Sequence, residues 1–276
     1  MTATPQGLEQ SRRQHPLGRP RLPGIPERLR YGLIGFLIVL PLWEAVVQLG
    51  IVKRVTLSAP TIILNTAVND LVVQRTLWPH LGQSSQQFFL GLGLALLLGV
   101  PLGLALGMFR RLNYFLDPWL SAIYATPTIA LVPLIVLVLG LGLESKIFIV
   151  FLEAIFVIVV TTMAGVHAAE ARYLDLARSF RASGWLRFRS VILPSSFPYI
   201  LTALRLGVTR ALVGVVVAEF FAANKGLGFY INFSGTTLRT DRVMLGVIML
   251  GLLGVMLGEA VRRVEKRYEK WRPEFN

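Results

Sequence analysis

Six long apolar blocks, separated by polar segments, dominate the pattern of this chain. Each block holds about 20 residues, enough for a helix to cross the roughly 30 Å hydrocarbon core of a bilayer. A lipid-exposed backbone must satisfy its own hydrogen bonds, and the blocks are too uniformly apolar for barrel strands with alternating faces. The pattern therefore predicts an all-α membrane protein with six transmembrane helices, at residues 31–50, 86–109, 119–142, 146–166, 197–223 and 243–262.

The polar segments divide the chain further. Residues 1–30 are rich in Arg and Pro and lack the apolar core of a cleavable signal peptide, so we expect a cytoplasmic N-terminal tail. Residues 31–265 form the expected transmembrane domain, and residues 266–276 form a cytoplasmic C-terminal tail. Between the first two blocks, Pro60 and Thr61 open an amphipathic run, which predicts a short helix on the outer membrane surface.

Basic residues lie almost entirely between the apolar blocks. The chain is 54% hydrophobic and only 16% charged, and its net charge is +13. With the N-terminus inside, 19 Lys and Arg residues lie on the cytoplasmic side and seven on the outer side, the bias that sets the orientation of membrane proteins. The sequence thus predicts a multi-pass protein of the bacterial inner membrane with both termini cytoplasmic. Its positive charge is assigned to contact with the anionic lipid bilayer and not to nucleic acid.

The motifs of common enzyme classes are missing from the sequence. It contains no G-x-x-x-x-G-K-[ST], so the chain does not hold ATP by the usual P-loop. It contains no cysteine, and His15, His80 and His167 have no spacing that would bring two of them onto one helix face. We therefore expect no catalytic residue, no metal site and no cofactor on this chain.

The connection at 167–196 combines five arginines with several large apolar residues. Asp175 and Ala177 are expected to begin a short helix, Gly184 to break it, and a second amphipathic helix to follow until Pro194 ends it. A solvated basic loop is the simpler interpretation. However, large apolar residues are costly to hold in water and are typical of a docking surface, so we favour docking to another protein.

The same connection resembles the cytoplasmic motif of permeases from ATP-binding-cassette (ABC) importers, which reads E-A-A, three residues, G, nine residues, I-x-L-P. Asp175, Leu176 and Ala177 stand at the first three positions, Arg181 stands at the glycine, and residues 191–194 stand at the last four. The match replaces Glu by Asp, the first Ala by Leu, Gly by Arg and Ile by Val. Ala177 and the final Leu-Pro are kept.

Arginine at the glycine position has a structural consequence. Glycine there suits a left-handed turn that an arginine would strain, so Gly184, three residues later, is expected to take over the turn. The resemblance assigns coupling to a separate ATPase to this segment. The residues expected to take part are Asp175, Ala177, Phe180, Arg181, Ser183, Gly184, Trp185, Phe188, Val191, Leu193 and Pro194.

The resemblance extends over residues 31–265 and is to the nitrate/sulfonate/taurine branch of these permeases. Its further motifs lie at residues 127–142, 162–166, 203–207, 218–219 and 226–228. It implies a type I importer permease fold (MetI-like) and pairing with a second copy as a homodimer. It also implies two ATPase subunits that bind ATP and Mg, and a periplasmic or lipid-anchored solute-binding protein that delivers the substrate.

Ionisable residues within the apolar blocks are costly and are therefore functional candidates. Arg205 and Glu219 are 14 residues apart, near one face of a helix but about 21 Å apart along its axis. Snorkelling to opposite interfaces is the alternative for both. Pro127, beside Thr126 and Thr128, frees backbone carbonyls that are tolerated at a cavity, and a structural kink is its alternative. The candidates for the translocation path are Thr126, Pro127, Thr128, Glu153, Arg205, Arg210 and Glu219.

Three functions remain open at this point: an ABC importer permease, an ion-coupled secondary transporter and a membrane scaffold without transport. A secondary carrier should show internal repeats and acidic groups near the midplane, where only Glu153 is placed. A scaffold would not need charges inside its spans. The branch suggests a small anion such as a sulfonate, nitrate or taurine, with a neutral or zwitterionic nutrient such as a pyrimidine vitamin precursor as the alternative. The sequence specifies neither the substrate nor whether the dimer is homomeric.

Overall fold

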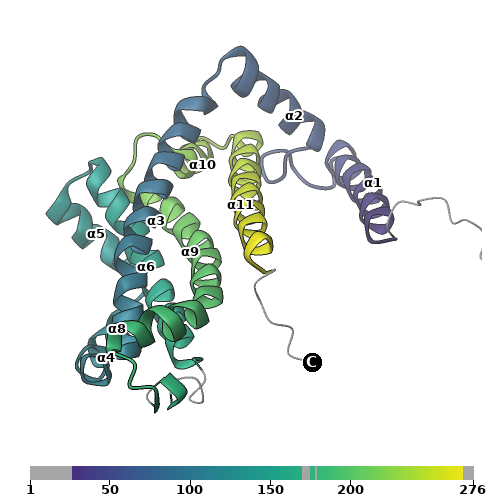
Figure 1. The fold of residues 1–276 in the computed structure, drawn as a ribbon. Coiled ribbons are helices and arrows are strands. Elements are labelled where there is room, and N and C mark those ends of the chain that lie inside the picture. Colours follow the sequence, from purple (N-terminus) through teal and green to yellow (C-terminus); the bar gives the residue numbers. More distant parts are fainter. Residues whose placement is uncertain (1–26, 170–174, 178, 270–276) are drawn as a thin grey trace, which may run out of the picture.

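The computed structural model describes residues 27–169, 175–177 and 179–269, and all regular elements within these ranges are helices (Figure 1). In this part of the chain, five helices are long and apolar enough to cross a membrane. They are α1 (Glu27–Gln48), α3 (Leu77–Met108), α6 (Leu143–His167), α9 (Leu193–Ala222) and α11 (Thr240–Glu269). The first, second, fourth, fifth and sixth predicted spans are thereby located. The sixth helix is longer than predicted, because it continues past residue 262 into the expected tail.

The third predicted span is not one straight helix. Residues 119–142 fall into α4 (Arg110–Ala125) and α5 (Thr128–Leu139), whose axes meet at 97°. The break has a local cause: Pro127 disfavours the helical region for the preceding residue, and Thr126 is accordingly extended, with φ −78° and ψ 124°. The predicted third span is therefore broken at Thr126 and Pro127, and the pair forms either a broken span or a re-entrant segment.

The core of the molecule is a bundle in which α6 packs along both α3 and α9. Close approach of these helices depends on glycine. A Cβ at Gly103 of α3 would lie 2.6 Å from the carbonyl oxygen of Val159, and a Cβ at Gly214 of α9 would lie 2.9 Å from the Cα of Val150. Small residues at such contacts let helix backbones approach closely, which compensates for the weak hydrophobic drive inside lipid.

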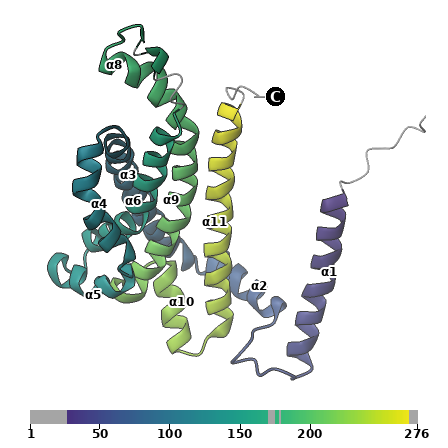
Figure 2. The same ribbon diagram turned by 90° about the horizontal axis from the view of Figure 1, so that it is seen from below.

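Two ends of the bundle can be distinguished. Figure 2 shows α8 (Gly184–Arg187), the start of α1 and the end of α11 at one end, called here the α8 end. At the other, the α2 end, lie α2 (Pro60–Val68) and α10 (Leu227–Thr236). The helix expected to open at Pro60 is confirmed, with its proline in the first turn. The short α10 was not predicted.

A buried ion pair holds the α2 end together. Asp70, in a π-helical turn (η1, Asn69–Val73) that continues α2, is fully buried and pairs with Arg242 of α11 at 3.0 Å. The Tyr230 hydroxyl of α10 donates a hydrogen bond of 2.7 Å to the same carboxylate. Burial and this bond raise the pKa of Tyr230 far above its usual value, so the phenol stays protonated and can donate. One carboxylate thus joins η1 to α10 and α11, two elements that lie far from it in sequence.

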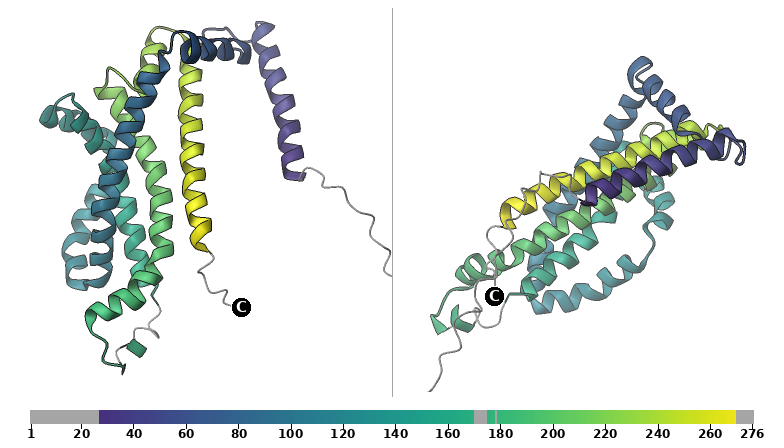
Figure 3. Two further views of the ribbon diagram at one scale, coloured as in Figure 1. Left: turned by 45° about the horizontal axis from the view of Figure 1, so that its top comes forward. Right: turned by 90° about the vertical axis from the view of Figure 1, so that its right-hand side faces the viewer.

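The helix α1 stands apart from the bundle (Figure 3). Most of its described side chains are exposed, including Tyr31, Phe36 and Leu37. It is attached near its end, where the Glu44 carboxylate accepts hydrogen bonds from the backbone N–H of Thr61 (3.1 Å) and from its hydroxyl (2.7 Å). So large an apolar surface requires a covering of lipid or protein.

The segment before α9 is continuous with it. α8 runs into a π-helical turn, η2 (Phe188–Ile192), and then into α9 without interruption, a stretch of 39 residues from Gly184 to Ala222. The expectation that Pro194 ends a helix was wrong, because Pro194 lies in the first turn of α9. A widened π turn just before a proline gives room to the ring and to the carbonyl that loses its N–H partner.

Candidate functional site

Five of the seven candidates for the translocation path line one cavity. It has a volume of about 470 Å³ and lies between the corner where α4 meets α5 and the facing sides of α6 and α9. Thr126, Pro127 and Thr128 come from the corner, Glu153 from α6 and Arg210 from α9. We call it the corner cavity. Its size is within the range of small-molecule sites, about 300–1,000 Å³.

Arg210 is the one cation among these five residues. It lies midway along α9, its side chain is exposed in the isolated chain, and it has no hydrogen bond or ion pair with another described residue. A charged side chain deep in a membrane helix is costly unless it meets water, a counter-charge or a ligand. The corner cavity supplies the space in which Arg210 can meet one of these.

Arg205 does not share this cavity. Helix positions five residues apart point about 140° away from each other, so Arg205 and Arg210 lie on different sides of α9. Arg205 forms an ion pair with Glu265 of α11 and lines a smaller cavity, of about 190 Å³, towards the α8 end. The expectation that Arg205 and Glu219 line one surface was wrong, because different helices pack over the two residues.

Glu219 is buried in the last turn of α9, beside the start of α10. Only 1% of the residue is exposed, and its carboxylate accepts hydrogen bonds of 2.7 Å from the Ser84 hydroxyl and from the backbone N–H of Gly228. Ser84 in turn accepts from the backbone N–H of Leu227 at 2.8 Å. Gly226 has φ +123°, and a Cβ there would overlap the carboxylate. The carboxylate therefore caps the positive N-terminal end of α10 and does not snorkel to the interface.

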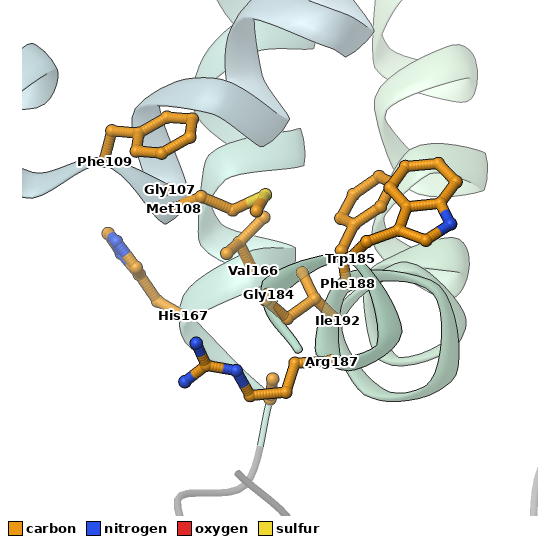
Figure 4. A pocket seen from close by; sticks show the side chains of 11 residues that line it. Gly107, Met108, Phe109, Val166, His167, Gly184, Trp185, Arg187, Phe188 and Ile192 are labelled. Carbon is orange, nitrogen blue, oxygen red and sulfur yellow. The ribbon is translucent and has the colours of Figure 1, made fainter. Parts of the chain in front are cut away.

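A second cavity, of about 810 Å³, opens at the α8 end. It lies between the α3–α4 junction, the end of α6 and the α8–η2 segment. In Figure 4, His167 and Arg187 lie at one part of its wall, and Trp185 and Phe188 lie at another. The cavity therefore offers both an apolar surface and positive or hydrogen-bonding groups to whatever enters it.

The predicted coupling segment beside this cavity leaves large apolar side chains uncovered. Phe180 is 80% exposed and Trp185 is 69% exposed, while Phe188 is partly buried and packs 5.5 Å from Trp185. Local hydrogen bonds fix the backbone: Ser183 accepts from the N–H of Leu186 at 3.3 Å and so caps α8. The remaining residues of the motif lie in helical turns, Asp175 and Ala177 before this cap, and Val191, Leu193 and Pro194 within η2 and α9.

Arg181 adopts the backbone conformation that glycine favours. Its φ is +53°, in the left-handed region, whereas Gly184 lies at the start of α8 without a positive φ. The expectation that Gly184 takes over the turn was wrong. The left-handed residue is Arg181 itself, which stands at the glycine position of the motif. Holding a non-glycine residue there costs roughly 1–2 kcal/mol. The local hydrogen bonds, such as Ala182 N–H to the carbonyl of Ala177 at 2.9 Å, offset part of that cost.

Known proteins resemble this chain in sequence and in architecture. Residues 95–270, well over half of the chain, match the family described as binding-protein-dependent transport system inner membrane component. The chain belongs to this family. Its role as the membrane permease of an ABC importer, predicted from the coupling motif, is thereby confirmed over the secondary-carrier and scaffold alternatives.

Individual relatives agree with the branch predicted from sequence. The chain is 31% identical over 254 residues to the putative aliphatic sulfonates transport permease protein SsuC of Bacillus subtilis, covering 91% of this chain and 92% of that one. It is 31% identical over 241 residues to the taurine transport system permease protein TauC of Escherichia coli, covering 86% and 88%. The inward-facing structure of the MetNI methionine ABC transporter aligns with a TM-score of 0.58 at 16% identity, over 67% of this chain and 92% of that one. The MetI-like fold is thus confirmed.

Sequence reasoning missed the polar partners that hold the α2 end. Asp70, Arg242 and Tyr230 were not singled out, although a lone Asp within the largely apolar run of residues 60–73 was a usable signal. Ser84 was missed as well. It lies 135 positions before Glu219, and only the packing of α3 against the α9–α10 turn brings the two together.

Proposed function

We propose that this permease carries a small organic anion, such as a sulfonate, into the bacterial cytoplasm, and that two separate ATPase subunits drive it by gripping residues 175–194. The permease acts as a homodimer in the inner membrane, and its α8 end and both of its termini are cytoplasmic. A periplasmic or lipid-anchored binding protein delivers the substrate to the α2 end. The sulfonate and taurine permeases among the relatives support the substrate class.

One structural observation carries the proposed mechanism: the coupling segment and the corner cavity share one helix. The stretch from Gly184 to Ala222 is continuous, with Trp185 at its start and Arg210 near its middle, about 37 Å further along at the usual helical rise. Movement of α8 by a partner is therefore transmitted directly to the wall of the cavity. Rocking of rigid helices around a fixed site is how alternating access is achieved in many transporters.

The second observation is the composition of the α8 end. Exposed aromatic residues beside an apolar cavity are typical of the centre of a protein interface, and arginines at its edge favour an acidic partner. Phe180 and Trp185 provide the aromatic part, while Arg187 and Arg189 provide the basic part. This chain has no P-loop, so ATP and Mg are assigned to the partner.

Uptake into proteoliposomes tests the proposed function. We expect vesicles that contain this chain and its ATPase to accumulate a radiolabelled sulfonate, taurine or ethanesulfonate, only with ATP inside and the solute-binding protein outside. Vesicles without binding protein, or with a non-hydrolysable ATP analogue, serve as controls. Accumulation driven by an ion gradient without ATP, or uptake of a neutral pyrimidine in place of sulfonates, would contradict the proposal.

A further inference from the structure

We infer that the corner cavity recognises a small zwitterion, with the acid group of the ligand at Arg210 and its ammonium group at Glu153. This inference deepens the proposed function, on which it rests, by naming the substrate class that the permease itself selects. It places a specificity site within the membrane chain, in addition to whatever the binding protein selects. Three features of the cavity carry it.

The first feature is a pair of opposite charges that do not pair with each other. Arg210 of α9 and Glu153 of α6 both line the cavity, yet neither forms an ion pair or hydrogen bond within the described residues. Two charges left apart in a largely apolar wall are costly. A ligand that brings one charge of each sign satisfies both at once.

The second feature is the place where Glu153 of α6 packs against α9. The Cβ and Cγ of Glu153 lie against Gly214 of α9. A Cβ added to Gly214 would be 3.2 Å from the Glu153 Cβ and 3.4 Å from the Glu153 Cγ. Gly214 is four residues after Arg210 and therefore lies near the same helix face. The base of the Glu153 side chain thus lies about one helical turn along α9 from Arg210. A simple anion bound at Arg210 would be repelled by the Glu153 carboxylate, whereas an ammonium group on the same ligand would be attracted.

The third feature is an aromatic wall close to Glu153. Tyr124 of α4 and Phe156 of α6 both line the cavity, with ring centroids 6.3 Å apart and planes tilted by 59°. Phe156 is three residues after Glu153 on α6, so the two side chains emerge on neighbouring turns. Aromatic faces attract ammonium groups through the ring quadrupole and also cover a short alkyl chain. The hydroxyls of Thr126 and Thr128 complete the polar lining.

Paired substrates that differ only in the amino group test this inference. Taurine (2-aminoethanesulfonate) and ethanesulfonate are compared in the proteoliposome assay, with the same binding protein in every experiment so that its own preference cancels between variants. We expect Glu153→Gln to lower the ratio of taurine to ethanesulfonate uptake at least tenfold relative to wild type. Glu153→Asp should keep most of the ratio, and Arg210→Gln should lower uptake of both compounds at least tenfold.

The outcomes separate the inference from the function on which it rests. Wild-type vesicles that accumulate neither compound would overturn the proposed function and the inference together. An unchanged uptake ratio in Glu153→Gln, with wild-type accumulation intact, would overturn the inference alone. Equal loss of both substrates in Glu153→Gln, with normal yield of folded protein, would also overturn it, because that result shows Glu153 pairing within the protein, for example with Arg210 of a second copy.

Discussion

Replacing Phe180 or Trp185 by alanine is expected to release the ATPase from the permease while leaving the permease folded in the membrane. Both side chains are mostly exposed, at 80% and 69%, so the substitutions remove little internal packing. Buried aromatic anchors at interfaces contribute about 2 kcal/mol or more each, roughly a thirtyfold loss of affinity. The measurement is the amount of ATPase that co-purifies with each variant in nanodiscs.

Two control variants give this result its meaning. Trp78→Ala removes an exposed tryptophan at the α2 end and should leave co-purification unchanged. Arg189→Gln removes an exposed charge beside α8 and should weaken binding less than the loss of an aromatic anchor, because rim charges mainly speed association. If the ATPase co-purified at wild-type levels with both Phe180→Ala and Trp185→Ala, residues 175–194 would be a solvated basic loop and not a docking surface.

Replacing Glu219 by alanine is expected to destabilise the permease severely. The substitution leaves the Ser84 hydroxyl and the Gly228 N–H buried without their acceptor. Each unsatisfied group costs about 1–3 kcal/mol, and the N-terminus of α10 also loses its negative cap. A loss of several kcal/mol should sharply reduce the yield of monodisperse protein and lower its thermal midpoint in detergent.

Glycine substitutions give an independent check of the same site. Gly226→Ala should be as damaging as Glu219→Ala, because its φ is +123° and its Cβ would overlap the Glu219 carboxylate. Gly251→Ala is the matched control: it lies in α11, and nothing is within 4 Å of its added Cβ. A normal thermal midpoint for both Glu219→Ala and Gly226→Ala would show that this buried network does not hold the fold.

The apolar pattern was sufficient to place the long helices. Blocks of about 20 apolar residues have no stable alternative to spanning, so α1, α3, α6, α9 and α11 follow from the sequence. The corner between α4 and α5 does not follow. Pro127 indicates a kink, but whether it becomes a 97° break depends on how α5 packs, through Val132 and Ile135, against its neighbours.

Some of the functional residues could be placed from the sequence, and others only from contacts between helices. The resemblance to the importer motif assigned residues 175–194 to one coupling segment, and helix geometry could have separated Arg205 from Arg210 in advance. Glu219 could not be placed from its own helix, because its partners come from α3 and α10. Contacts between elements far apart in sequence decide whether an intramembrane charge faces a cavity, an ion-pair partner or a helix terminus.

Cross-linking from a single introduced cysteine shows directly whether the α8 end is the surface that binds the ATPase. The chain has no cysteine, so Arg189→Cys and Val55→Cys each offer one unique attachment point for a benzophenone maleimide, at the α8 end and the α2 end respectively. On illumination, we expect an adduct with the co-expressed ATPase from Arg189→Cys and none from Val55→Cys. ATPase adducts from Val55→Cys, or none from Arg189→Cys in a complex that still takes up substrate, would contradict this expectation.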